Sequence, residues 1–258
     1  MTKALGKLYL MPNTLDFGTD GALPSLEETL APAVIRIASR IEHWVVESAK
    51  STRHFLKRVN AVVPLTRRLQ DIEIFELPRP VKGRPNAPSP QVTQLLAPAM
   101  KGQDMALLSE AGLPAVADPG ASLIQLAHGH GIEVVALPGA SSLLLALAAS
   151  GLNGQGFSFV GYLPIGVAER ARRIRELETE SAHDGQTRLM IEVPYRNQAL
   201  LDALVEQLRD TTLLSVSSGL TLAGGFSRTD RVAAWRRAKP SLPGNIPAVF
   251  LLLAPGDP

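Results

Sequence analysis

The sequence predicts an α/β fold, because short apolar runs typical of buried strands alternate with helical patterns along most of its 258 residues. The apolar runs end repeatedly in proline or glycine, as strands do where the chain turns. The content of 45% apolar and 19% charged residues is ordinary for a globular protein with a buried core. Alternation of strands with helices also predicts mainly parallel sheet.

Eight segments have the length and apolar content of buried strands: 7–11, 43–46, 104–108, 133–137, 157–160, 188–191, 213–216 and 248–253. Five segments between them have helical patterns: 33–41, 122–128, 141–150, 167–180 and 197–209. Pro32 and Gly151 fit the first turn of one helix and the residue after another. These assignments define the predicted core.

The chain divides into two predicted α/β domains, because strand–helix alternation restarts after a break that begins at Pro138. We assign residues 1–138 to an N-terminal domain and 139–258 to a C-terminal domain, with a connecting helix at about 141–150. Residues 78–90 contain five prolines and few apolar side chains. They predict an extended surface loop.

The composition excludes several classes of chemistry. The chain has no cysteine, which removes disulfides, thiolate catalysis and thiolate metal ligands. Its five histidines show no metal-ligand spacing, so we expect no metal site. The first twelve residues do not resemble a signal peptide, and the apolar run 143–149 is far shorter than the roughly 20 residues that span a bilayer. We therefore expect a cytoplasmic protein with no membrane partner.

Basic residues are concentrated in three clusters although the formal net charge is only +2. Residues 36–84 contain eleven Lys and Arg against five Asp and Glu. The other clusters are Arg170, Arg172, Arg173 and Arg175, and Arg231, Arg236, Arg237 and Lys239. They are either solvated helix faces or a footprint for a polyanion, and the second interpretation requires the clusters to share a face.

Gly and Pro punctuation is densest after two strands that we expect to be neighbours. The strand ending at Leu108 is followed by Gly112 and Pro114, and then by Asp118, which we expect to cap the next helix. The strand ending at residue 137 is followed by Pro138-Gly-Ala-Ser-Ser142 and a helix. Ligands of open α/β sheets bind outside the carboxyl ends of strands. The two turns therefore predict a pocket with exposed backbone N–H groups and hydroxyls.

The stretch Ser109–Gly120 resembles the S-D-A-G-x-P-x-x-x-D-P-G signature of the ribosomal RNA small subunit methyltransferase I family, within the tetrapyrrole methylase superfamily. It matches seven of the eight fixed positions, with Glu110 in place of Asp. The similarity continues through 157–164 (FSFVGYLP), which resembles F-x-x-x-G-F-L-P. Weaker similarities at 6–12, 47–54, 191–196 and 244–250 extend it over most of the chain.

The resemblance implies a two-domain tetrapyrrole methylase-like fold, with S-adenosylmethionine in a cleft between the domains, and a homodimer. It also implies which residues contact the cofactor: Pro12, Glu110, Gly112, Leu113 and Pro114 from the first domain, Ser141 and Ser142 at the start of the connecting helix, and Val193, Asn245, Ile246, Pro247 and Ala248 from the second domain. Hydroxyls and helix N–H groups suit the methionine carboxylate, and apolar walls suit adenine.

The implied activity is methyl transfer to a ribose 2′-hydroxyl of ribosomal RNA, and RNA is the expected partner. Because that hydroxyl is a weak acid, a base and a phosphate anchor would help, and Glu47 and Arg53 are the candidates for these two roles. Segments 12–16, 75–80 and 217–221 depart from the family pattern where a substrate would dock. Two alternatives therefore stay open: methylation of a small molecule such as a corrin or tetrapyrrole, and cofactor binding without turnover.

Overall fold

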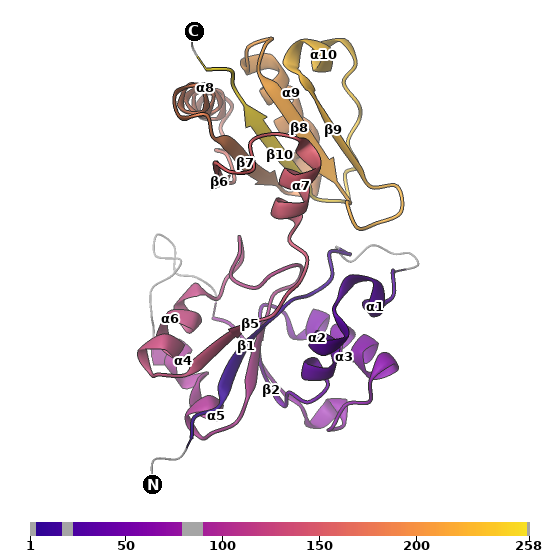
Figure 1. Ribbon diagram of the computed structural model, residues 1–258, viewed down its shortest axis with the longest axis vertical. Coiled ribbons are helices and arrows are strands. Elements are labelled where there is room, and N and C mark those ends of the chain that lie inside the picture. Colours follow the sequence, from indigo (N-terminus) through magenta and orange to yellow (C-terminus); the bar gives the residue numbers. More distant parts are fainter. Residues whose placement is uncertain (1–3, 17–22, 79–89, 257–258) are drawn as a thin grey trace. The chain divides into compact units, whose positions relative to one another are not determined.

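The computed structural model describes residues 4–16, 23–78 and 90–256. Within these ranges the chain forms two compact units, coloured from indigo to magenta and from pink to yellow in Figure 1. Unit 1 comprises Met1–Leu15 and Pro24–Ser141, and unit 2 comprises Ser142–Pro258 together with Asp16–Leu23. The proline-rich segment predicted to be a surface loop lies almost wholly outside the described residues.

Unit 1 is built on a parallel five-stranded sheet. Its strands are β1 (Lys7–Met11), β2 (His43–Val46), β3 (Glu73–Glu76), β4 (Met105–Leu108) and β5 (Glu133–Ala136), in the order β3-β2-β4-β1-β5. All four pairings are parallel, so the carboxyl ends of the five strands meet at one edge. Parallel strands require helical crossovers, which explains why helices separate them in the sequence.

Helices cover both faces of this sheet. The elements α1 (Leu26–Thr29), α2 (Pro32–Ala38) and α3 (Ala49–Val62) pack on Trp44, Val46 and Leu108. On the other face, α4 (Pro90–Gln94), α5 (Ala97–Met100) and α6 (Ala121–Gly129) pack on Leu8, Val45 and Leu107. A 3₁₀ turn, η1 (Leu69–Asp71), precedes β3. Alternate residues of each strand thus reach opposite cores, as the strand period of two requires.

Unit 2 contains a mixed sheet, which contradicts the expectation of mainly parallel pairing. Its strands are β6 (Phe157–Gly161), β7 (Thr187–Glu192), β8 (Leu213–Ser218), β9 (Phe226–Arg231) and β10 (Ala248–Leu253), in the order β6-β7-β10-β8-β9. Only β6 and β7 pair in parallel, and the three remaining pairings are antiparallel. Strand–helix alternation misled the prediction because β10, the last strand, inserts between β7 and β8, and the sequence carries no sign of that order.

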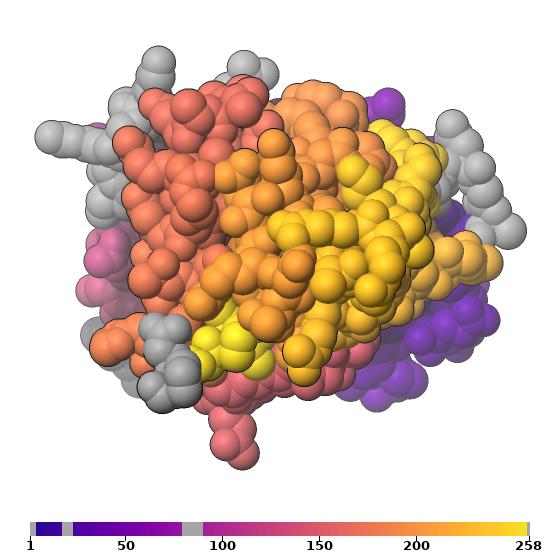
Figure 2. Space-filling view, turned by 90° about the horizontal axis from the view of Figure 1, so that it is seen from above, coloured from indigo at the N-terminus to yellow at the C-terminus, as the bar shows by residue number. Residues whose placement is uncertain are grey.

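Helices also cover both faces of the second sheet. The elements α8 (Val167–Asp184), α9 (Asn197–Gln207) and α10 (Val232–Arg237) enclose a core with Trp235 and Phe250, and η2 (Pro194–Arg196) precedes α9. The single helix α7 (Ser142–Ser150) packs on the opposite face, against Leu189 and Leu251. Orange and yellow residues of unit 2 form most of the face seen in Figure 2.

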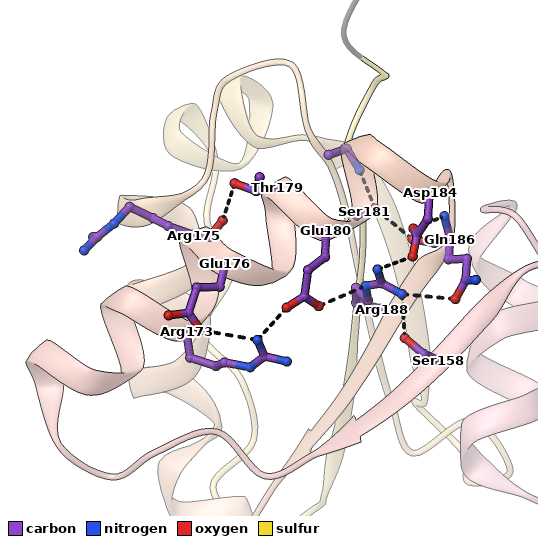
Figure 3. A network of polar contacts seen from close by, with 11 residues as sticks. Ser158, Arg173, Arg175, Glu176, Thr179, Glu180, Ser181, Asp184, Gln186 and Arg188 are labelled. Carbon is purple, nitrogen blue, oxygen red and sulfur yellow. Dashed lines mark hydrogen bonds and ion pairs between the residues drawn. The ribbon is translucent and has the colours of Figure 1, made fainter.

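A polar network fixes α8 to β7 (Figure 3). The side chain of Arg188 is only 6% exposed and donates to Oδ2 of Asp184 at 2.6 Å and to Oγ of Ser158 at 2.8 Å. Glu180 lies between Arg188 and Arg173, and Oε1 of Glu180 accepts from Arg173 at 2.7 Å. A buried guanidinium requires such partners, because an unpaired buried charge is strongly destabilising.

All eight predicted strands and all five predicted helices are present, with ends that differ by a few residues. The apolar patterns did not predict β3 and β9, the long helix α3 or the short helices α1, α4, α5 and α10. The six residues of β9 (FSRTDR) have no apolar alternation, because the strand lies at the edge of its sheet. By contrast, α3 does carry a signal: its buried Thr52, Phe55, Leu56 and Val59 have helical spacing.

Candidate functional site

Three loops meet at the carboxyl edge of the unit 1 sheet, where ligands of parallel sheets bind. They follow β1, β4 and β5, and they contain every unit 1 residue predicted to contact a cofactor. The expectation that the strands ending at 108 and 137 are neighbours was wrong, because β1 lies between β4 and β5. The loop that follows β1 therefore connects the two Gly- and Pro-rich turns.

Asn13, which sequence analysis did not single out, binds the β4 loop to the β1 loop. Its buried amide nitrogen donates to the carbonyl oxygens of Ser109 at 3.1 Å and Glu110 at 2.9 Å. Its backbone N–H donates to the carbonyl of Gly112 at 2.8 Å, and its Oδ1 accepts from the N–H of Thr14. Since a buried amide left without partners costs free energy, Asn13 fixes the position of the loop that carries the family signature.

Two glycines allow these loops to approach each other. Gly112 has φ +68°, a left-handed conformation that favours glycine. At Gly139, an added Cβ would lie 2.1 Å from Cβ of Pro12 and 3.4 Å from a side-chain atom of Leu113. Pro12, Gly112 and Leu113 therefore belong to one packed platform, and only glycine fits at position 139.

The carboxyl groups of Glu47, Glu110 and Asp118 lie near one another beside this platform. Glu47 follows β2, and its Oε2 accepts from the N–H of Glu110 at 3.2 Å. Burial raises the pKa of Glu47 above its usual range, although the hydrogen bond from Glu110 opposes this. Burial, and next the negative charge of Glu47, raise the pKa of Asp118 to about 7, against a lowering hydrogen bond from Ser109. Asp118 is thus poised to gain or lose a proton near neutral pH.

The expected capping role of Asp118 is not observed. Helix α6 begins at Ala121, its N-cap is Gly120, and no side chain caps it. The preceding loop instead holds Ala115 and Ala117 at φ +63° and +64°. Such conformations cost alanine free energy and concentrate at functional sites. The Asp118 carboxyl instead interacts with Ser109, Glu47 and Glu110.

Arg53, the candidate phosphate anchor, lies on the exposed surface of α3. Its Nη1 donates to the backbone carbonyl of Ala49 at 3.4 Å, and no ion pair joins it to Glu47 within the described residues. Glu47, the candidate base, is half-buried at the carboxyl end of β2, whereas Arg53 is exposed to solvent.

The predicted cofactor residues of unit 2 also converge on one edge. Val193 follows β7, and residues 245–248 lead into β10, whose first residue Ala248 pairs with both Glu192 and Ser218. Asn197, missed by sequence analysis, is 1% exposed and donates to the carbonyl of Ile246 at 2.8 Å. The Oδ1 atom of Asn197 is buried and has no hydrogen-bond partner among the residues that the structure describes. This edge can accept a hydrogen bond from a ligand.

Four of the eight residues in the two basic clusters of unit 2 form ion pairs with acids within the described residues. In unit 2, Arg172 and Arg173 pair with Glu176, Arg236 with Asp210, and Lys239 with Asp202. These clusters fit solvated helix faces. In unit 1, a groove of about 460 Å³ is lined by Lys57, Arg67 and Arg68. Arg67 and Arg68 pair with Glu42 and Asp71, whereas Lys57 has no ion-pair partner within the described ranges.

Two further observations restrict the kind of site. Among the described residues, no group of three His, Asp or Glu side chains is arranged to bind a metal ion. Within the same ranges, no helix has both the length and the apolar character needed to cross a membrane.

The class of fold is defined by two α/β units. The first has a parallel sheet with loops packed at its carboxyl edge, and the second has a mixed sheet. Solved structures share this fold. The uroporphyrin-III C-methyltransferase of Thermus thermophilus has a TM-score of 0.50 and 21% identity, covering 96% of this chain and 92% of that one. The methyltransferase CobJ has a TM-score of 0.53 and 17% identity, covering 97% and 100%. These likenesses confirm the predicted two-domain tetrapyrrole methylase fold.

The sequence itself identifies the family. Residues 21–225 match the model of the Tetrapyrrole (Corrin/Porphyrin) Methylases, and the chain belongs to this family. It is 39% identical over 141 residues to the ribosomal RNA small subunit methyltransferase I of Mesorhizobium japonicum, covering 55% of this chain and 47% of that protein. For the same enzyme of Pseudomonas aeruginosa the identity is 39% over 109 residues, covering 42% and 36%. The matches thus span less than half the length of these relatives.

Proposed function

We propose that this chain is an S-adenosylmethionine-dependent methyltransferase that methylates a ribose 2′-hydroxyl of ribosomal RNA. The observation that carries the proposal is the platform of Pro12, Gly112 and Leu113. The platform lies at the carboxyl edge of a parallel sheet, where ligands of such sheets bind, and Gly112 and Leu113 belong to the stretch that resembles the family signature. The names of the curated relatives support RNA as the acceptor.

The residues present fit the cofactor. Asn197 offers a buried acceptor that has no partner among the described residues, and such an acceptor suits the amino group of an adenine. Asn197 donates to the carbonyl of Ile246, and Val193 and residues 245–248 lie at this same edge of the unit 2 sheet. Ser141 ends unit 1 and Ser142 begins α7 in unit 2, so their hydroxyls and the helix N–H groups suit a carboxylate. Each set is proposed to contact the cofactor.

The bound cofactor supplies an activated methyl group on a sulfonium. The protein aligns the acceptor hydroxyl with it, excludes water and receives the hydroxyl proton. Glu47 is the proposed base: its burial makes its carboxylate more basic than an exposed one, and the hydrogen bond from Glu110 orients it. Arg53 is the proposed phosphate anchor. We also infer a cytoplasmic location and a homodimer; sedimentation of the purified protein would test the homodimer.

Calorimetry with S-adenosylmethionine tests the first half of the proposal. Binding is expected, and its absence at millimolar cofactor would reject the enzyme. Transfer of labelled methyl groups to small ribosomal subunits tests the second half, with corrin-type precursors as the competing acceptors. Label in RNA supports the proposal, label in the precursors assigns the chain to small-molecule methylation, and tight binding without transfer indicates a protein that has lost turnover. Glu47→Gln should bind cofactor normally but transfer methyl groups at least about tenfold more slowly.

A further inference from the structure

A second hollow lies away from the candidate site, at the edge of the unit 1 sheet where the strands begin. It has a volume of about 440 Å³, within the range of small-ligand pockets. His43 and Glu73, the first residues of β2 and β3, pair in register at this edge. The hollow is lined by His43, Phe75, Gln91, Gln94, Lys101 and Gln103, and its apolar lining includes Leu95 and Pro98.

Glu73 orients the imidazole ring of His43. Its Nδ1 lies 3.1 Å from Oε2 of Glu73, and the His43 side chain is 12% exposed. When Nδ1 donates to this carboxylate, Nε2 of the neutral ring is an acceptor. Nε2 is buried and has no hydrogen-bond partner among the residues that the structure describes. A buried acceptor of this kind gains from a ligand that donates to it.

The rim offers free amides beside an aromatic face. Gln91, Gln94 and Gln103 are exposed, and no hydrogen bond engages their side chains within the described part of the chain. Each amide presents a donor and an acceptor side by side, which matches the edge of a nucleobase. Phe75 lies on the edge strand β3 and is 46% exposed, so its ring is available for stacking. Lys101 adds one cation for a phosphate.

We propose that this hollow binds one nucleotide of a single-stranded RNA. The base stacks on Phe75 and bonds to the glutamine amides and to Nε2 of His43, while Lys101 contacts a phosphate. Single-stranded RNA is recognised in this way, by stacking on aromatic side chains together with hydrogen bonds to exposed base edges. The inference rests on the proposed function, because RNA is the substrate there, and it assigns a docking point outside the methyl-transfer site.

Fluorescence anisotropy with a short labelled single-stranded RNA tests the inference. Phe75→Ala should weaken binding about tenfold or more, because stacking carries that much affinity per base. The double variant Gln91→Ala/Gln94→Ala should also weaken it. Phe75→Tyr, which keeps the stacking face, should bind within about twofold of the native protein. Phe157→Ala is the matched control, since Phe157 is 43% exposed and begins β6 in unit 2.

Native affinity in Phe75→Ala would overturn the inference. A second experiment measures the binding of adenosine monophosphate or uridine monophosphate. If either nucleotide binds in a manner that depends on Phe75 and the RNA does not, the hollow binds a free nucleotide, and the proposal that it binds RNA is overturned. Calorimetry with S-adenosylmethionine on the same proteins separates this inference from the proposed function. Loss of RNA affinity in Phe75→Ala without any cofactor binding would reject the enzyme and support the nucleotide hollow. Normal cofactor binding together with an RNA affinity that does not depend on Phe75 would support cofactor binding by the candidate site and overturn the nucleotide hollow.

Discussion

Replacing Asp118 with asparagine should stabilise the protein above neutral pH. The pKa of Asp118 is raised to about 7 from 3.8, chiefly by burial and next by the charge of Glu47. Between these two pH values the folded state binds more protons than the unfolded state. The free energy of unfolding therefore falls as pH rises from about 4 to 7, and the loss is complete above the folded pKa. An amide has no charge to bury, so Asp118→Asn escapes this loss.

The size of the effect follows from the two pKa values. Their difference of 3.2, at about 1.36 kcal/mol per pKa unit, gives a ceiling of about 4 kcal/mol. Because the carboxyl is only partly buried and solvent screens it, we expect about 2 kcal/mol. Asp118→Asn should thus exceed the native protein by this amount at pH 8 and equal it near pH 4.

Urea unfolding of both proteins between pH 4 and 8 measures the effect, and subtraction cancels the titration of groups that the variant does not alter. In a Glu47→Gln background the advantage of Asp118→Asn should shrink, because the neighbouring negative charge is gone. A difference that stays constant with pH, or a variant less stable than native at pH 8, would refute the electrostatic reasoning.

Three other perturbations test the strand-edge platform. Gly139→Ala should lower the free energy of unfolding, measured with urea, by about 2 kcal/mol or more, because the added Cβ would lie 2.1 Å from Cβ of Pro12. In the control Gly129→Ala, the added Cβ has no atom within 4 Å, so this variant should be neutral or slightly stabilising. Asn13→Ala should cost about 2–3 kcal/mol and weaken cofactor binding, since it deprives the buried carbonyl of Ser109 and the half-buried one of Glu110 of a donor. Asn60→Ala on the exposed surface should cost under about 1 kcal/mol, and equal costs for the two variants would contradict the role of Asn13. Ser142→Trp should abolish cofactor binding in calorimetry with an unchanged circular dichroism spectrum, and retained binding would mean that the pocket is misplaced.

The elements of this fold could largely be predicted, because burial imposes a period on the apolar side chains of strands and helices. Strands such as β1 and β10 have the bounds expected from their apolar runs. Prediction failed where burial leaves no pattern, as in β9, and for α3 because its basic residues obscured a helical pattern that is present.

The α/β character, most of the elements and the family signature can be read from the amino-acid sequence, since each depends on residues close together along the chain. The folded structure was needed to show that β1 separates β4 from β5, and that β10 makes the second sheet mixed. It also decided that Glu47 and Asp118 share one acidic environment, and that Asn13 holds the signature loop. Strand order, burial and pKa depend on contacts between residues far apart in the chain, and no local pattern records those contacts.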